Sequence, residues 1–215
     1  QLGGRCAFVP QSPQILNGTL RANVLFGAAW DEARYRRALQ ACCLEPDIAQ
    51  LADGDLTEIG EKGITISGGQ RARVALARAH FANADVVVLD DPLSAMDPHV
   101  GRAVFQECIL RDMRDAGCAV LFMTNQIHFC EAADRVLVLE HGKIVEDGSL
   151  AELRAAGGIF AELCATALPS DAQSGAAEAG PAAAAGPAKS ALPGLMQRLR
   201  PCLSGAIPDG CLPLP

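Results

Sequence analysis

Aromatic residues are scarce in this chain, which has one Trp, one Tyr and seven Phe among its 215 residues. Half of the residues are nevertheless hydrophobic, so the core is expected to be aliphatic and large enough for one domain. No apolar segment reaches the roughly 18 residues that a membrane-spanning helix needs, and the N-terminus has no signal-peptide pattern. The chain is therefore expected to contain no membrane-spanning segment of its own.

Positive charge is limited as well. Lys and Arg together number 18 against 25 Asp and Glu, which gives a formal net charge of −7. Nucleic-acid phosphates are held by clustered basic residues, so this composition predicts no nucleic-acid partner. The densest basic group is Arg34, Arg36 and Arg37, which is expected to form a solvated helix face.

The nine cysteines show no C-x-x-C pair and no regular spacing. The adjacent residues Cys42 and Cys43 would be strained as a disulfide. A reducing, cytosolic setting is the simpler account of this pattern.

A phosphate-cradling loop of the form G-x-x-x-x-G-K-[ST] is also absent. The nearest approach is Gly142-Lys143, where Leu137 occupies the first glycine position and Ile144 the Ser/Thr position. Such a loop supplies backbone amides and a lysine to the β- and γ-phosphates of a nucleotide. The chain is therefore expected not to hold a nucleoside triphosphate by itself.

A Ser-Gly-Gly-Gln run at residues 67–70 is the first positive signal, because it opens a helical pattern that continues to residue 81. Ser67 is a typical N-cap residue, and the two glycines leave the backbone bare. Several N–H groups at the positive end of this helix can then face an anion.

Two adjacent carboxylates form the second signal. The short β-branched run 86–89 is followed by Asp90 and Asp91, and it is typical of a strand buried on both faces of a parallel sheet. Ligands bind at the carboxyl ends of such strands. The pair is therefore expected to hold Mg²⁺, directly or through water, and to orient a water for attack on a phosphate.

The rest of the chain alternates helical and extended patterns up to residue 167, beyond which Ala, Gly, Pro and Ser dominate. Residues 168–215 are expected to be a disordered linker or tail. Arg71, Arg73 and Arg78 are assigned to a solvated helix face, and His141-Gly142 to a hairpin turn. The expected helices are 31–43, 47–51, 70–81, 98–110 or 98–113, and a pair ending near 165; the expected strands are 4–9, 86–89, 119–123, 135–139 and 143–146.

The order and spacing of these signals resemble the nucleotide-binding domain of ATP-binding cassette (ABC) transporters. Residues 66–70 resemble the signature motif, 86–90 the Walker B strand, 94–97 the D-loop and 8–11 the strand and Q-loop. The run GTLRANVLFG at 18–27 is similar to a segment of exporters. The run TEIGEKG at 57–63 is similar to the C subfamily, the multidrug-resistance-associated group, and DPLSA at 91–95 resembles its first nucleotide-binding domain.

This resemblance implies an α/β fold, a partial P-loop NTPase-like ABC ATPase domain over residues 1–167, with a parallel sheet core and a helical signature subdomain. It implies ATP and Mg²⁺ as cofactors. The signature would contact ATP held by a partner domain, while Asp90 and Gln11 would serve the metal. The residues so assigned are catalytic Asp91, Asn125 and Gln11, and cofactor-binding Ile66, Ser67, Gly68, Gly69, Gln70 and Asp97.

The sequence departs from the family at several points. Asp91 stands where the family usually has a catalytic glutamate, and Asn125 where it has the switch histidine; His128, three residues on, is expected to point elsewhere. The Walker A loop and some strands beside Walker B are expected to be missing. Either a fragment of a longer product or a true truncation fits these absences.

The function implied is an ATP-hydrolysing cassette of a membrane exporter, with a second nucleotide-binding domain and the transmembrane domains as partners, on the cytosolic face of a membrane. The chain alone is expected to be inactive. Two alternatives remain open: a non-catalytic interaction module that docks on a partner, and a soluble ABC ATPase of DNA repair or translation. The transported substrate is not readable from the sequence.

Overall fold

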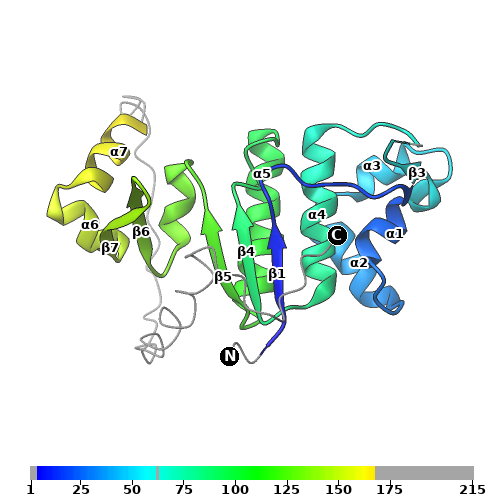
Figure 1. Cartoon of the computed structure of the whole chain (residues 1–215), viewed down its shortest axis with the longest axis horizontal. Helices are drawn as coiled ribbons and strands as arrows, with labels where there is room; N and C mark the ends of the chain where they lie inside the picture. Colours follow the sequence, from blue (N-terminus) through cyan, green and yellow to red (C-terminus); the bar gives the residue numbers. More distant parts are fainter. Residues whose placement is uncertain (1–3, 62, 168–215) are drawn as a thin grey trace, which may run out of the picture. The chain divides into compact units, whose positions relative to one another are not determined.

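The computed structural model describes residues 4–61 and 63–167, and within them the chain forms two compact units (Figure 1). The first unit ends at Thr124 and the second begins at Asn125. The expected tail, residues 168–215, lies outside the described residues. Among the residues described, no helix is long and apolar enough to cross a bilayer.

A three-stranded parallel sheet forms the centre of the first unit, with the order β1-β4-β5. Its strands are β1 (Cys6–Val9), β4 (Val86–Asp90) and β5 (Ala119–Met123). Val87 pairs with Ala7 on one side and Val120 on the other. The parallel sheet predicted from the sequence is confirmed, and β4 has a neighbour on both sides. The expectation that strands beside it are missing is wrong in this respect.

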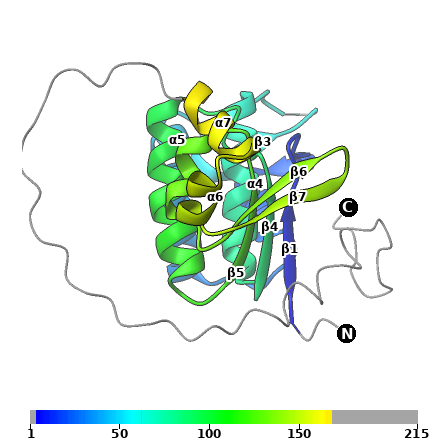
Figure 2. The ribbon, with the colours of Figure 1, turned by 90° about the vertical axis from the view of Figure 1, so that its left-hand side faces the viewer.

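Burial along β4 alternates, which corrects the prediction of a strand buried on both faces. Val87 and Leu89 are 2% and 0% exposed, whereas Val86 and Val88 are only half-buried. The reason is visible in Figure 2, where α4 and α5 lie on the same side of the three strands. β5, also predicted to be buried, is half-buried for most of its length.

Helix α4 (Gly68–Ala82) is the longest helix of the described chain. Its apolar side chains recur at helical spacing and pack into the core of the first unit. Asn83 ends it in the left-handed conformation, with φ of 49°, a geometry that Asn tolerates better than most residues. The residues of α4 buried in this way are Ala72, Val74, Ala75, Leu76, Ala77, Ala79 and Phe81.

Short elements surround α4 in the first unit. Asp31 caps the helix expected from residue 31, and Pro46 lies in the first turn of the next helix, where proline is tolerated. The elements are β2 (Gly18–Thr19), α1 (Leu20–Leu25), α2 (Glu32–Ala41), α3 (Glu45–Ala49), η1 (Gly54–Leu56) and β3 (Glu58–Ile59).

The helix predicted to follow Pro98 forms in two parts. Pro98 opens α5 (Pro98–Val104) as expected. The chain then continues as η2 (Phe105–Arg114), a π-helical segment. Gly117, in a left-handed conformation with φ of 95°, lies in the turn between this helical segment and β5.

Most of the arginines predicted to be solvated are engaged in contacts. Arg36 and Arg71 are exposed, but Arg78 donates to the backbone oxygen of Asn23 at 2.9 Å, and burial lowers its pKa. Helical periodicity predicts which face a residue occupies, but not which carbonyls and carboxylates pack against that face. The prediction is wrong for Arg34, Arg37, Arg73 and Arg78.

The second unit is a β-hairpin with short helices. His141 and Gly142 both have positive φ, 48° and 75°, which confirms the predicted tight turn. Val136, Val138, Leu153, Phe160 and Cys164 form its buried cluster. The elements are η3 (Ile127–Ala132), β6 (Val136–Glu140), β7 (Lys143–Gly148), α6 (Leu150–Ala156) and α7 (Ile159–Ala167).

Candidate functional site

The amino end of α4 is closed by a reciprocal pair of hydrogen bonds. The Gln70 backbone N–H donates to Ser67 Oγ at 3.2 Å, and the Ser67 N–H donates to Gln70 Oε1 at 2.8 Å. This capping box satisfies two of the backbone donors near the helix start. The predicted N-cap role of Ser67 is confirmed, and the side chain of Gln70 is part of the same cap.

The capping box leaves the backbone N–H groups of two glycines at this helix end. In the part of the chain that the structure describes, neither Gly68 nor Gly69 donates its N–H to a protein acceptor. Both lie at the positive end of a helix of 15 residues, where backbone N–H groups attract an anion. Ile66, by contrast, is only 9% exposed, and its side chain packs in the core.

Gly69 is also in close contact with the segment after β4. A Cβ atom added at Gly69 would lie 2.9 Å from the backbone oxygen of Ala95, whereas one at Gly68 would lie 3.8 Å from the Ala95 Cβ. A side chain at position 69 would therefore push these two segments apart. The structure brings the predicted signature and D-loop segments together through this glycine.

The carboxamide of Gln70 connects the cap to helix α3. Its Nε2 donates to Asp47 Oδ1 at 2.8 Å. Arg73 donates to the same carboxylate at 3.0 Å and to the backbone oxygen of Cys43 at 3.2 Å. Sequence reasoning missed Asp47 and misjudged Arg73, because nothing in the local pattern shows that α3 packs beside the start of α4.

The two predicted carboxylates lie at the carboxyl end of the central strand. Asp90 pairs with Met123 in the sheet, and Asp91 follows in a left-handed conformation with φ of 45°. Asp91 is 9% exposed, and Thr124 Oγ1 lies 3.4 Å from its Oδ1. A buried carboxylate held in a sparsely populated backbone conformation is a common feature of functional sites.

Three other predicted residues have different surroundings. Gln11 is exposed and follows β1, whose carboxyl end lies beside that of β4 because the strands are parallel. Asp97 caps α5, with its Oδ1 accepting the His99 N–H at 2.9 Å. Asn125 is exposed and belongs to the second unit; its place in the site stays a prediction.

His128 lies beside an aromatic ring of the second unit. It is exposed, and its ring centroid lies 4.1 Å from that of Phe129. The expectation that it points away from a nucleotide stays a prediction, since it too lies in the second unit.

The residues present fit one side of a Mg²⁺ and phosphate site. Asp90 offers an oxygen ligand of the kind that Mg²⁺ prefers, and Mg²⁺ is commonly held by one or two carboxylates together with substrate phosphates. Residues 4–61 and 63–167 contain no group of three or more His, Cys, Asp or Glu that could hold a metal ion. The carboxylates therefore fit as partial ligands that depend on a bound phosphate.

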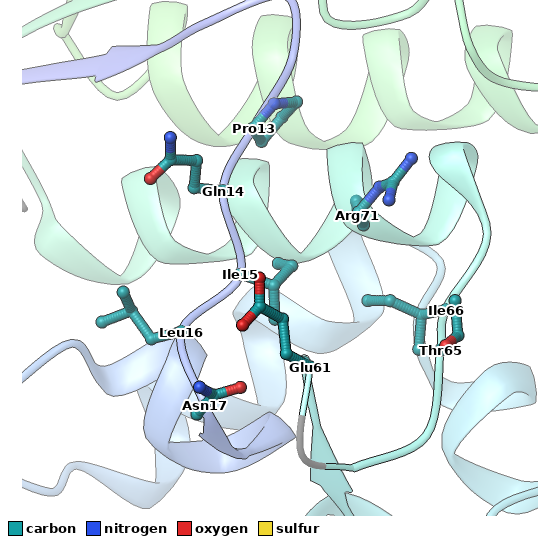
Figure 3. A pocket seen from close by; sticks show the side chains of 10 residues that line it. Pro13, Gln14, Ile15, Leu16, Asn17, Glu61, Thr65, Ile66 and Arg71 are labelled. Carbon is teal, nitrogen blue, oxygen red and sulfur yellow. The ribbon is translucent and has the colours of Figure 1, made fainter.

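A cavity of about 610 Å³ opens beside the signature segment. Figure 3 shows the chain from Pro13 to Asn17 on one side of it and Glu61, Thr65 and Ile66 on the other. Arg71 reaches toward it from α4. The lining combines apolar side chains with the Glu61 carboxylate and the Arg71 guanidinium.

Comparison with known proteins agrees with this geometry. Residues 1–94 match the family model described as ABC transporter. The chain is 46% identical over 153 residues to "Putative ABC transporter C family member 15" of Arabidopsis thaliana, an alignment that covers 71% of this chain and 14% of the relative.

Two human relatives give similar values. "ATP-binding cassette sub-family C member 2" is 47% identical over 159 residues, 74% of this chain and 10% of the relative. "ATP-binding cassette sub-family C member 4" is 44% identical over 160 residues, 74% of this chain and 12% of the relative. The chain thus spans between a tenth and a seventh of the length of the curated relatives it matches.

Proposed function

Because this chain belongs to the ABC transporter family, in its C subfamily, we propose that it works as part of the ATP-hydrolysing cassette of a membrane exporter, specifically of the first of two such cassettes. The observation that carries this proposal is the amino end of α4. There a closed capping box lies beside two glycine amides that donate to no acceptor among the described residues, and Gly69 lies close to Ala95. An anionic phosphate is the ligand that such a helix end accommodates.

The phosphate bound there belongs to a nucleotide held by another domain. Ser67, Gly68 and Gly69 contact the γ-phosphate of ATP whose main cradle lies in a second nucleotide-binding domain. ATP is then sandwiched between the two domains. Its binding drives their dimerisation, which powers efflux.

The carboxyl end of β4 serves a different nucleotide. Asp90 and Gln11 would hold Mg²⁺, which would neutralise charge on the phosphates. Asp91 accepts a hydrogen bond from the attacking water, and Asn125 donates to a γ-phosphate oxygen. Asp91 reaches about 1 Å less far than a glutamate, and a misplacement of that size can cost about a hundredfold in rate.

The two half-sites therefore differ in turnover. Hydrolysis occurs mainly at the site that the signature completes, while the site served by Asp91 and Asn125 binds ATP without efficient turnover. The isolated chain should show no measurable ATPase activity and weak or no ATP binding.

The cavity of Figure 3 receives a segment of the transmembrane domains. Ile15 and Leu16 offer apolar contacts in it, and Glu61 and Arg71 offer opposite charges. The chain is thereby held at the cytosolic face of a membrane.

The test is an exchange in human sub-family C member 2, whose 159 aligned residues are replaced by those of this chain. We expect this exchange transporter to hydrolyse ATP, and Ser67→Arg to reduce turnover more than tenfold. Ser149→Arg is the matched control, because Ser149 closes the same kind of capping box, with Glu152, at α6 in the second unit.

Unchanged turnover in the Ser67→Arg exchange transporter would show the proposal to be wrong. Titration calorimetry of the isolated chain with MgATP tests the division into half-sites. Tight binding there would contradict the view that the nucleotide cradle lies elsewhere.

A further inference from the structure

The capping box of Ser67 and Gln70 has a further hydrogen-bond partner, Asp47, which lies outside the signature segment. Gln70 uses both ends of its carboxamide, since Oε1 accepts the Ser67 N–H and Nε2 donates to Asp47 Oδ1. Swapping the two ends would turn a donor toward the Ser67 N–H. The cap therefore depends on which way the amide is turned.

Asp47 decides that orientation. An ionised carboxylate only accepts hydrogen bonds, so it requires the Nε2 end of Gln70 and leaves Oε1 for Ser67. The Asp47 side chain is 16% exposed, so little water is present to compete for this bond. We propose that Asp47 is the positioning residue of the signature, which acts through Gln70 to hold Ser67 and the glycine amides in phosphate-binding geometry.

Arg73 holds Asp47 in place. Its Nη2 lies 3.0 Å from both carboxylate oxygens of Asp47, and its Nη1 donates to the backbone oxygen of Cys43 at 3.2 Å. Cys43 has a left-handed φ of 53° just after α2. The guanidinium, 14% exposed, thus binds α3 and the end of α2 to the first turns of α4.

This arrangement links the helical segment before the signature to the signature itself. A displacement of α3 relative to α4 would break the bond between Asp47 and Gln70 before any residue in contact with phosphate moved. Asp47 therefore affects phosphate binding without touching the nucleotide. The inference deepens the proposed function and rests on it.

The first experiment needs no nucleotide. Amide hydrogen exchange of Ser67 is measured in the full chain carrying Asp47→Asn, an isosteric change that lets the side chain donate as well as accept. We expect the Ser67 amide to exchange about tenfold faster, a fold-change that corresponds to about 1.4 kcal/mol of local protection. Glu45→Gln, which removes an exposed charge from the same helix, should leave the rate unchanged.

A compensating change separates positioning from general damage. Gln70→Glu faces Asp47 with a second carboxylate and should also speed exchange. In the double variant, the amide introduced by Asp47→Asn donates to the carboxylate introduced by Gln70→Glu. That carboxylate can still accept the Ser67 N–H, as in the Ser-x-x-Glu form of the capping box. Protection of Ser67 should then return, which independent structural damage from two substitutions would not produce.

The second experiment follows ATP turnover in the exchange transporter. Asp47→Asn should lower kcat about tenfold, with recovery in the double variant and no change in Glu45→Gln. Unchanged Ser67 exchange in Asp47→Asn overturns the inference. The inference is also wrong if Asp47→Asn speeds Ser67 exchange but leaves ATP turnover normal, while Ser67→Arg abolishes turnover. In that case the proposed function still stands. If Ser67→Arg also leaves turnover intact, the proposed function fails and the inference fails with it.

Discussion

At the amino end of α4 the polar side chains hydrogen-bond one another, whereas at the carboxyl end of β4 the two carboxylates have few partners. Ser67, Gln70 and Asp47 form a continuous chain of hydrogen bonds. The Asp91 carboxylate lies 3.4 Å from the Thr124 hydroxyl, a long contact. The side-chain carboxylate of Asp90 accepts no hydrogen bond and forms no ion pair among the residues that the structure describes.

This difference shows how the two half-sites, the amino end of α4 and the carboxyl end of β4, are held in position. The signature half is preorganised by its own polar network, so its geometry is complete without a ligand. The two carboxylates at the carboxyl end of β4 are positioned by the packing of that strand, and their charges have few partners among the residues that the structure describes. The predictions below test this division.

The largest effect is expected in the packing that supports the carboxylates. Leu89 is 0% exposed and directly precedes Asp90, so Leu89→Ala should lower the free energy of unfolding by about 2–5 kcal/mol. Val88→Ala, on the half-buried face of the same strand, should cost about 1 kcal/mol. Urea denaturation measures both, and equal losses would contradict one-sided support of β4.

A steric effect is expected at the signature. Gly69→Ala places a Cβ against the Ala95 backbone oxygen and should destabilise the chain by about 1–3 kcal/mol. Gly68→Ala meets only ordinary contact at 3.8 Å, so it should be neutral or stabilising. Thermal unfolding of the two variants measures this difference. Equal unfolding temperatures would contradict the close contact between Gly69 and Ala95.

A smaller, matched effect is expected at the two capping boxes. Ser67→Ala and Ser149→Ala each remove an N-cap that closes a reciprocal pair, so each should cost about 0.5–2 kcal/mol in unfolding free energy. ATP turnover of the exchange transporter should fall only with Ser67→Ala. A parallel fall with Ser149→Ala would mean that lost stability, rather than the signature, limits turnover.

The smallest effect is a pH dependence at the far end of α4. His80 Nε2 lies 2.9 Å from Asp112 Oδ2, and Arg37 and Arg34 also act on it. Burial lowers the pKa of His80 below its ordinary 6.5, although Asp112 opposes the shift. The unfolded chain therefore binds a proton more readily, so stability should fall as pH drops from 6.5 toward the lower folded pKa.

His80→Gln keeps a donor for Asp112 but does not titrate, and it should flatten the dependence between pH 6.5 and the acid range. Burial tends to raise the pKa of Asp112, but its hydrogen bonds to Arg37 and His80 outweigh this and hold it below its ordinary 3.8, so loss of that contribution begins only at lower pH. Denaturant midpoints across this range measure how stability changes with pH in the unaltered chain and in His80→Gln. Identical slopes in the two proteins would exclude His80 as the source.

Local patterns predicted much of the fold and part of the site. The Ser67 cap, the parallel strands ending in Asp90 and the His141-Gly142 turn all depend on residues close in sequence, and each is confirmed. Asp47 lies 23 positions before Gln70, and the approach of Gly69 to Ala95 depends on how two segments pack. Such contacts are set by tertiary structure, which helical and strand periodicity do not describe.

The open face of the three-stranded sheet has a consequence for handling the protein. Phe8 and Met123, on the two outer strands, are 54% and 38% exposed; Phe8 lies beside the half-buried Val88 of β4, and Met123 lies beside Asp90. A band of apolar side chains on twisted strands attracts other apolar surfaces. Produced on its own, the chain should stain with hydrophobic dyes while folded and engage chaperones in the cell, so its lifetime there would depend on quality control as much as on its folding free energy.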